Sequence, residues 1–306
     1  MGSTNHTTKR KKKFFRRNRL GIAAFVVLLI GVVCGGLQYS DFVSRTVYKE
    51  SVSHLTEVFH QSNNLLSELA DKNLTYLHMW SEYLTNTSDE SEIREYIDKA
   101  QEEAGFLSFY FLSADGNYKM ATGETGYLGL QENLEDEIRQ GKDLITNVAL
   151  PGKSQMLVFV SPRAYGTYQG FEYDAIAIAY ENADIVKVLD ISAFQGNAKS
   201  YVVHSDGRVV IDHSNESWGT VYNFFGVLRE HSDISEEIIL ELSDQFKEGR
   251  TDAMLVKLDG KDYYLVYEKS KIQDWTLLGL VPTDIVNTSM NTLQFTTMLL
   301  VGAVML

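Results

Sequence analysis

FYFLSADG (residues 109–116) and SYVVHSDG (residues 200–207) are two copies of one pattern, an apolar, strand-like run that ends in Asp-Gly. A second strand-like run follows each copy, at 117–121 and at 208–212. Asp-Gly between two such runs predicts a β-hairpin, because both residues tolerate a positive φ. Asp259-Gly260 stands between two further apolar runs and predicts a third hairpin.

Further strands and helices are expected around these hairpins. Short apolar runs predict strands, and apolar residues at helical spacing predict amphipathic helices. The expected strands are 106–112, 144–150, 155–160, 173–180, 253–258, 262–268 and 275–281, and the expected helices are 92–104, 134–140, 184–194, 221–229 and 235–247. Hairpins with helices on one side, rather than alternating strand–helix–strand units, indicate an α+β fold with antiparallel sheets.

A long helix is expected before the first hairpin, because residues 41–86 contain neither Gly nor Pro. Positions in alternating steps of three and four form a stripe that is apolar at seven of nine places: Val52, Leu55, Phe59, Ser62, Leu66, Leu69, Asn73, Tyr76 and Trp80. Such a stripe is typical of a helix with one buried face. The stripe could pack against the chain's own sheets or against a second copy of the helix in a dimer, and the sequence does not decide between these two partners.

Both ends of the chain are apolar, and the first apolar stretch, Leu20–Leu37, follows eight basic residues. As a helix it would be about 27 Å long, close to the thickness of a membrane's hydrocarbon core. Basic residues stay on the cytoplasmic side, so we expect a cytoplasmic tail (1–19) and an uncleaved membrane helix (20–38) rather than a signal peptide. The uncharged run Leu293–Leu306 predicts a second, truncated membrane helix (289–306), with a buried helix as the alternative.

The charge balance differs between the tail and the rest of the chain. The formal net charge is -13, and the first nineteen residues hold eight basic and no acidic side chains. The remaining residues therefore carry -21, which disfavours nucleic acid and anionic membrane surfaces as partners. Cys34 is the only cysteine and lies in the expected membrane segment, so the expected outer region contains no disulfide.

Signals for catalysis and for a metal site are poor. The sequence has no Gly-x-Ser-x-Gly, no His-Glu-x-x-His, no phosphate loop and no pair of cysteines, so we expect no catalytic residue and no cofactor. In a two-residue Asp206-Gly207 hairpin, His204 would oppose Val209 and His213 would oppose Ser200. The two histidines would then lie about 13 Å apart along the strands, too far to share one metal ion.

The whole arrangement resembles a double Cache sensor domain, a pair of tandem PAS-like modules found outside the membrane in bacterial receptors. The features that carry the resemblance are the membrane helix, the long stalk helix, the two strand–Asp-Gly–strand units and the closing strand WTLLGLVP (275–282) before the second membrane helix. It covers about 39–290. It implies a stalk helix (39–79), a membrane-distal module (80–195) and a membrane-proximal module (196–288).

The resemblance also implies a ligand pocket in the distal module and a homodimer whose stalk helices pass a shift to a cytoplasmic module. That module would be a histidine kinase, a diguanylate cyclase or a chemotaxis signalling domain. Members of the family that bind amino acids carry Arg-x-Trp after the first hairpin and an Asp at the end of the last distal strand. This chain has YKM (118–120) without Arg-x-Trp, and its last distal strand ends in Tyr180, which argues against a free α-amino acid.

Aromatic walls with a few charged groups suit a small-molecule pocket. The candidates on the distal strands and loops are Tyr110, Tyr118, Arg163, Tyr165, Asp174 and Tyr180. Arg163 is the candidate for holding a carboxylate, and Asp174 for holding an amine. Ala175, Ala177 and Ala179 alternate with the even positions of their strand, and their small side chains allow either close packing of a helix or room for a ligand.

These observations predict a non-catalytic, extracytoplasmic small-molecule sensor of a receptor in the inner or plasma membrane. Two alternatives come from other classes. A membrane-anchored hydrolase would need a catalytic constellation, and a structural or adhesion ectodomain would have flat, filled sheets. A cavity of a few hundred Å³ beside the distal sheet would favour the sensor.

Overall fold

The computed structural model describes residues 5–129, 134–149, 155–189, 198–213 and 221–286. The side chains of helix α1 are described from Gly31 onward, with gaps. The chain divides into two units, Val52–Val286 and a second unit made of residues 1–51 and 287–306. The sheets, their helices and every contact discussed below belong to Val52–Val286.

Helix α1 (Asn5–Asn86) is continuous and confirms a long helix over the predicted region without Gly or Pro, 41–86. It begins well before the expected stalk, so the boundary predicted between 38 and 39 lies inside one helix. Among the residues that could be searched, no helix is long and apolar enough to cross a membrane. Most side chains of the first predicted membrane segment, and all of the second, lie outside the described residues.

The first antiparallel sheet has six strands in the order β3-β2-β1-β8-β5-β4. Its elements and neighbours are α2 (Glu90–Ala104), β1 (Ser108–Leu112), β2 (Asn117–Met120), β3 (Thr125–Tyr127), α3 (Leu134–Arg139), β4 (Leu144–Ala149), β5 (Gln155–Ser161), the small hairpin β6 (Gly166–Tyr168) and β7 (Phe171–Tyr173), and β8 (Ala175–Glu181). Strand β8 lies at the centre, paired with β1 on one side and β5 on the other. Residues of β8 are therefore flanked by residues of β1 on one side and of β5 on the other.

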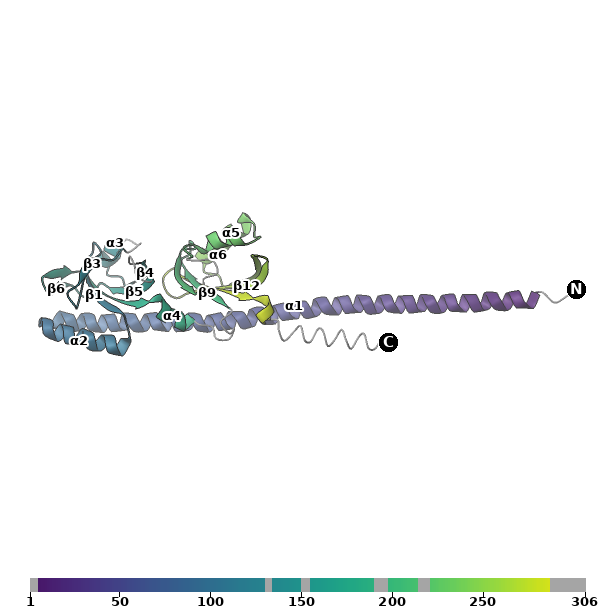
Figure 1. Ribbon diagram of the computed structural model, residues 1–306, viewed down its shortest axis with the longest axis horizontal. Helices are drawn as coiled ribbons and strands as arrows, with labels where there is room; N and C mark the ends of the chain where they lie inside the picture. The colour runs from purple at the N-terminus through teal and green to yellow at the C-terminus, as the bar shows by residue number, and fades with distance from the viewer. Residues whose placement is uncertain (1–4, 130–133, 150–154, 190–197, 214–220, 287–306) are drawn as a thin grey trace. The chain divides into compact units, whose positions relative to one another are not determined.

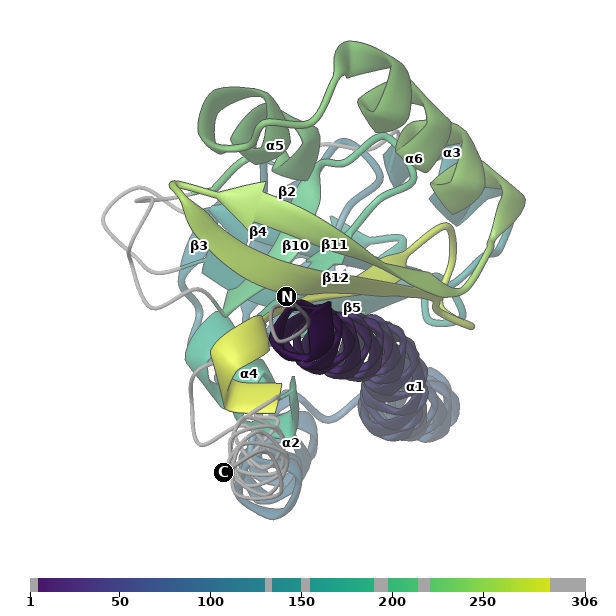
Figure 2. The ribbon, with the colours of Figure 1, turned by 90° about the vertical axis from the view of Figure 1, so that its right-hand side faces the viewer.

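The second antiparallel sheet has five strands in the order β10-β9-β13-β12-β11. Its elements and neighbours are α4 (Asn182–Leu189), β9 (Lys199–Val203), β10 (Val209–His213), α5 (Phe224–His231), α6 (Glu236–Glu248), β11 (Asp252–Leu258), β12 (Lys261–Lys269) and β13 (Thr276–Pro282). Figure 2 shows α5 and α6 on one face of this sheet and α1 on the other. The fold is therefore mixed helix and antiparallel sheet, as the sequence predicts.

The stripe on α1 packs against the chain's own sheets. Leu55, Phe59 and Leu66 are buried, and Trp80 stacks edge-on against Phe106. Of the two predicted partners of the stripe, the sheets are thus confirmed. A dimer seam stays a prediction.

The Asp-Gly hairpins form where the sequence predicts them, but only the third has the two-residue loop. Its strands pair Leu258 with Lys261, and both Asp259 and Gly260 have a positive φ. In the second hairpin the His204 N–H donates to the Arg208 carbonyl oxygen, so the predicted opposition of His204 and Val209 is wrong. The reason is that its loop holds three residues and ends in a glycine with φ 84°.

A register shift after Val209 then absorbs one residue, so that His213 does oppose Ser200 as predicted. The expected single strand 173–180 is also divided, between β7 and β8. Asp174 lies at the break, where its N–H donates to the Leu112 carbonyl oxygen at 2.9 Å. The end of the predicted helix 184–194 lies outside the described residues.

Edge strand β4 of the first sheet is joined to the second sheet by side chains. The Asn147 amide donates to the Val209 carbonyl oxygen of β10 at 3.2 Å. With its amide turned so that both of its polar atoms have partners, Gln273 donates to the Ile145 oxygen at 3.1 Å and accepts from the Ile145 nitrogen at 2.9 Å. These contacts satisfy backbone groups that an edge strand otherwise leaves open.

Candidate functional site

A row of alanines runs along the centre of the first sheet. On β8, Ala177 lies between Tyr110 of β1 and Val160 of β5, and Ala179 lies between Ser108 and Val158. Together the alanines make a row of small side chains on this face of the sheet, buried in one hydrophobic cluster between larger side chains of both neighbouring strands. We call it the alanine trough, formed by Ala175, Ala177 and Ala179 between Tyr110, Leu112, Val158 and Val160.

The alanine trough faces away from helix α1. Alternate residues of a strand point to opposite faces, and Tyr180 of β8 donates its hydroxyl to Asn73 of α1. The three alanines were predicted either to allow close packing of a helix or to leave room for a ligand. Helix α1 is not the helix that packs on them. The described helix on the trough side is α3, whose Ile138 packs against the same cluster.

Two of the predicted site residues meet along one side of the trough. The rings of Tyr110 and Tyr118 pack edge to face, with centroids 4.9 Å apart. Burial raises the pKa of Tyr110, and the nearby Tyr118 and Glu124 raise it further, against a lowering hydrogen bond with Ser108. Burial and then Glu124 raise the pKa of Tyr118. Both phenols therefore stay neutral at ordinary pH and can donate and accept hydrogen bonds.

Glu124 is the acidic residue beside these two phenols, and the sequence reasoning did not single it out. It lies in the turn between β2 and β3, where its backbone oxygen accepts from the Met120 N–H at 2.8 Å. The neighbouring Gly126 makes room for the phenol, since a Cβ there would lie 2.5 Å from the Tyr118 oxygen. An acid between two glycines, as in GETG (123–126), is a weak signal of a site when read from sequence alone.

The remaining four predicted residues lie elsewhere. Tyr180 is on the α1 face, where its hydroxyl donates to Asn73 Oδ1 at 2.7 Å, and burial raises its pKa to about 12. Tyr165 is 77% exposed in the loop before β6. Asp174 accepts from the Ala114 N–H at 2.8 Å and so ties the first hairpin to β8.

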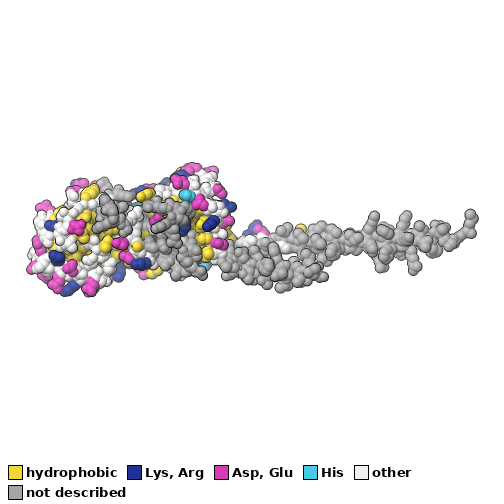
Figure 3. Space-filling model, in the orientation of Figure 1, with side chains coloured by type: hydrophobic (Ala, Val, Ile, Leu, Met, Phe, Trp, Pro, Cys, Tyr) yellow, Lys and Arg dark blue, Asp and Glu magenta, His cyan; other side chains and the backbone are white. Residues whose placement is uncertain are grey.

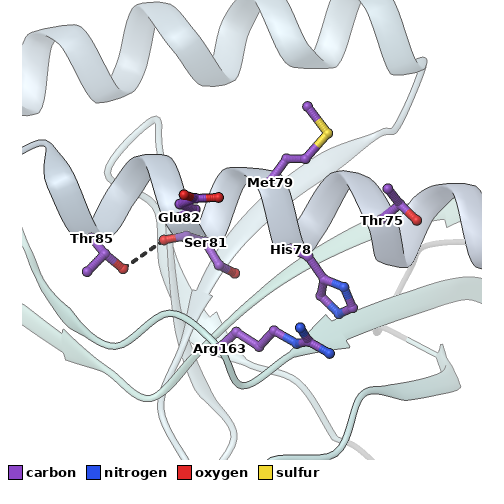
Figure 4. Close-up of a pocket in the computed structure, with 7 residues that line it drawn as sticks. All are labelled: Thr75, His78, Met79, Ser81, Glu82, Thr85 and Arg163. Carbon is purple, nitrogen blue, oxygen red and sulfur yellow. Dashed lines mark hydrogen bonds between the residues drawn. The ribbon is translucent and has the colours of Figure 1, made fainter.

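Arg163, the fourth of these, follows β5 and lies beside α1 (Figure 4). Its Nη2 is 3.9 Å from Asp143 Oδ2, and His78 Nε2 is 2.8 Å from the same oxygen. It lines a groove of about 370 Å³ that shares no lining residue with the alanine trough. The structure therefore brings together Tyr110 and Tyr118 but separates both from Arg163.

Polar side chains among the described residues bear on two further kinds of site, a metal site and a catalytic triad. In the described part of the chain, no group of three or more His, Cys, Asp and Glu side chains could hold a metal ion. His204 Nδ1 lies 2.8 Å from Asp274 Oδ1, and the Ser205 hydroxyl donates to the other oxygen of Asp274. A serine that donates to the aspartate instead of the histidine is not arranged as a nucleophile.

A long helix packed along two antiparallel sheets is also found in extracellular sensory domains of known structure. The chain matches the extracellular domain of mmHK1S-Z3, a protein assigned as a histidine kinase, with a TM-score of 0.54 and 14% identity over 81% of this chain and 98% of that one. It matches the sensory domain of the Campylobacter jejuni chemoreceptor Tlp3 with isoleucine bound, with a TM-score of 0.51 and 10% identity over 80% and 98%.

A third similar structure is the ligand-binding domain of the Pseudomonas aeruginosa chemoreceptor PctB with L-Arg, with a TM-score of 0.55 and 14% identity over 77% of this chain and 97% of that one. No family model matches the chain, and no curated protein matches its sequence significantly. The resemblance to Cache-type sensor domains is confirmed at the level of the fold. These neighbours are sensor domains rather than catalytic domains.

Proposed function

We propose that this chain is the extracytoplasmic sensor region of a membrane receptor of the double Cache type, and that a small molecule binds in the alanine trough. The observation that supports the proposal most directly is the trough itself. It lies in the first sheet, within the predicted distal module 80–195, and Tyr110 and Tyr118 lie beside it. Similar domains are crystallised with isoleucine or L-Arg bound.

The chemistry around the trough favours a ligand with an amine. Glu124 is the one carboxylate, among the described residues, that acts on both Tyr110 and Tyr118. Neutral phenols add hydrogen bonds, and the alanines accept an apolar portion. An amine beside Glu124 would gain a charge-assisted hydrogen bond.

The route from ligand to output is the second part of the proposal. We infer a homodimer anchored by membrane helices at 20–38 and 289–306, with residues 1–19 in the cytoplasm, on the sequence features given above. Helix α1 contacts both sheets and continues toward the N-terminal tail. A ligand would shift the receptor only if it bound one of its two states better than the other. A histidine kinase, a diguanylate cyclase and a chemotaxis module all remain candidates for the output.

A thermal-unfolding screen of the full chain in detergent micelles tests this proposal. The panel contains amines, amino acids, carboxylates, purines and sugars. We expect an amine to raise the unfolding midpoint with concentration, because a ligand that binds only the folded state stabilises it by about 2.7 kcal/mol at one hundred times its Kd. A panel in which no amine shifts the midpoint would contradict the amine assignment.

Ala177→Leu is expected to abolish that shift, since the larger side chain occupies the centre of the trough. The matched control is Ala253→Leu, which adds the same volume to a buried strand position of the second sheet. This control should still bind the amine. Equal binding by wild type and Ala177→Leu would place the ligand outside the trough.

A further inference from the structure

We propose a second ligand site, for a small organic monocarboxylate, in the groove beside Arg163. The groove has a volume of about 370 Å³ and is lined by Thr75, His78, Met79, Ser81, Glu82, Thr85 and Arg163. Figure 4 shows six of these side chains on α1, with the Arg163 guanidinium pointing toward His78. The groove is thus on the α1 side of the first sheet, opposite the alanine trough.

Arg163 is the cation with unused hydrogen-bond donors in this groove. The hydroxyls of Thr75, Ser81 and Thr85 all donate to carbonyl oxygens of their own helix, at 2.7–2.8 Å. The Arg163 side chain is 57% exposed, and its ion pair in the described part of the chain is with Asp143 at 3.9 Å. That distance is too long for a hydrogen bond. A guanidinium with free donors suits a carboxylate, which it can bind through two parallel bonds.

Asp143 lies between the two basic residues of the groove, His78 and Arg163, and makes its close contact with His78. One of its oxygens lies 2.8 Å from His78 Nε2, and the other is buried without a hydrogen-bond partner. Arg163 therefore lies between Asp143, to which it makes no hydrogen bond, and the open groove. A bound carboxylate would compete with Asp143 for the guanidinium, so Asp143 sets the affinity of the site.

The other lining residues select the size and charge of the ligand. Met79 is 56% exposed and supplies an apolar wall. Glu82 adds a negative charge that disfavours a second carboxylate on the ligand. On the face seen in Figure 3, acidic side chains are interspersed with Lys and Arg, so no broad positive patch attracts anions there. Affinity for an anion must then come from the Arg163 contact itself.

Ligand-observed NMR titration of the full chain in detergent micelles tests the site, with butyrate as the probe and succinate and butylamine for comparison. We expect saturable butyrate binding that is stronger than succinate binding. Arg163→Gln should weaken butyrate binding about 10- to 100-fold, because the charge-assisted bonds are lost. Asp143→Asn should tighten it several-fold, because the competing charge is removed while His78 keeps an acceptor.

The control is Arg139→Gln, which removes an exposed arginine that is paired with Glu135 on α3. It should bind butyrate as the wild type does. The amine and butyrate are titrated separately on the wild type, so failure of the amine-binding trough and failure of this site can be told apart. The proposal is overturned if butyrate does not saturate at about ten millimolar, or if Arg163→Gln binds it like the wild type.

Discussion

Replacing Gly279 by alanine is expected to destabilise the chain by about 3 kcal/mol. Gly279 lies in β13 at the place where helix α1 crosses the second sheet. A Cβ there would be 1.6 Å from Cζ of Phe59 and 2.1 Å from its Cε1. The Phe59 ring is fully buried, so the clash cannot be relieved by turning the ring into solvent. Either α1 or the strand must shift.

A double-mutant cycle identifies Phe59 as the cause. Phe59→Ala alone should cost about 3–5 kcal/mol, because it leaves a cavity. In that background the added methyl group meets no ring, and we expect Gly279→Ala to cost about 1 kcal/mol or less. The two substitutions should therefore be strongly non-additive. Urea unfolding of the four proteins measures each free energy of unfolding.

Gly226→Ala is the matched control for this cycle. Gly226 lies in helix α5, and a Cβ built there meets no atom within 4 Å. Alanine is also the better helix former, by about 1 kcal/mol, so this variant should be as stable as the wild type or slightly more so. If Gly279→Ala changes stability no more than Gly226→Ala does, the close approach of Phe59 to β13 is wrong.

Gly279 also shows which parts of the fold were open to prediction. Its strand was predicted from the local run WTLLGLVP (275–282), as the hairpins were from Asp-Gly and the buried stripe of α1 from its spacing. Each of these signals lies within a few residues of the chain. The reason for the glycine is a ring 220 positions earlier in the sequence, and no local pattern contains that contact.

The candidate site also depends on contacts between residues that are far apart in the sequence, and local patterns do not reveal them. Alternation along β8 separates Tyr180 from the alanines, but it does not say which of these two sets shares a face with Tyr110. That depends on the pairing of β1 with β8, in which Tyr110 opposes Ala177. It depends also on which face α1 covers. Arg163 was predictable as a candidate for holding a carboxylate, but its neighbour His78 lies on a helix far away in sequence.

Raising the pH from 10 to 12 is expected to destabilise the chain through two buried tyrosines. Burial raises the pKa of Tyr180 to about 12, with a further rise from Tyr76, against a lowering bond with Asn73. Burial likewise raises the pKa of Tyr267 to about 12, with further rises from Asp252 and Glu241. Both side chains are almost wholly buried. Their neutral forms are therefore favoured in the folded chain.

The direction follows from proton binding. An unfolded tyrosine loses its proton near pH 10. Between pH 10 and 12 the folded chain therefore holds more protons than the unfolded chain, and stability falls as pH rises. Each tyrosine should cost roughly 2–3 kcal/mol over this range, at about 1.4 kcal/mol per pH unit. Below pH 10 their contribution is fully present, so stability should not depend on them there.

The two tyrosines should contribute about equally to the fall of the free energy of unfolding with pH. Tyr180→Phe and Tyr267→Phe should therefore each remove about half of their joint contribution. Tyr180→Phe should also lower stability at pH 8 by about 1–3 kcal/mol, because Asn73 Oδ1 loses its donor while it stays buried. Tyr165→Phe is the control, since its ring is 77% exposed. Urea unfolding at half-unit steps from pH 8 to 11.5 measures the slopes. A Tyr180→Phe slope equal to that of Tyr165→Phe would show that the Tyr180 phenol is not buried between α1 and β8.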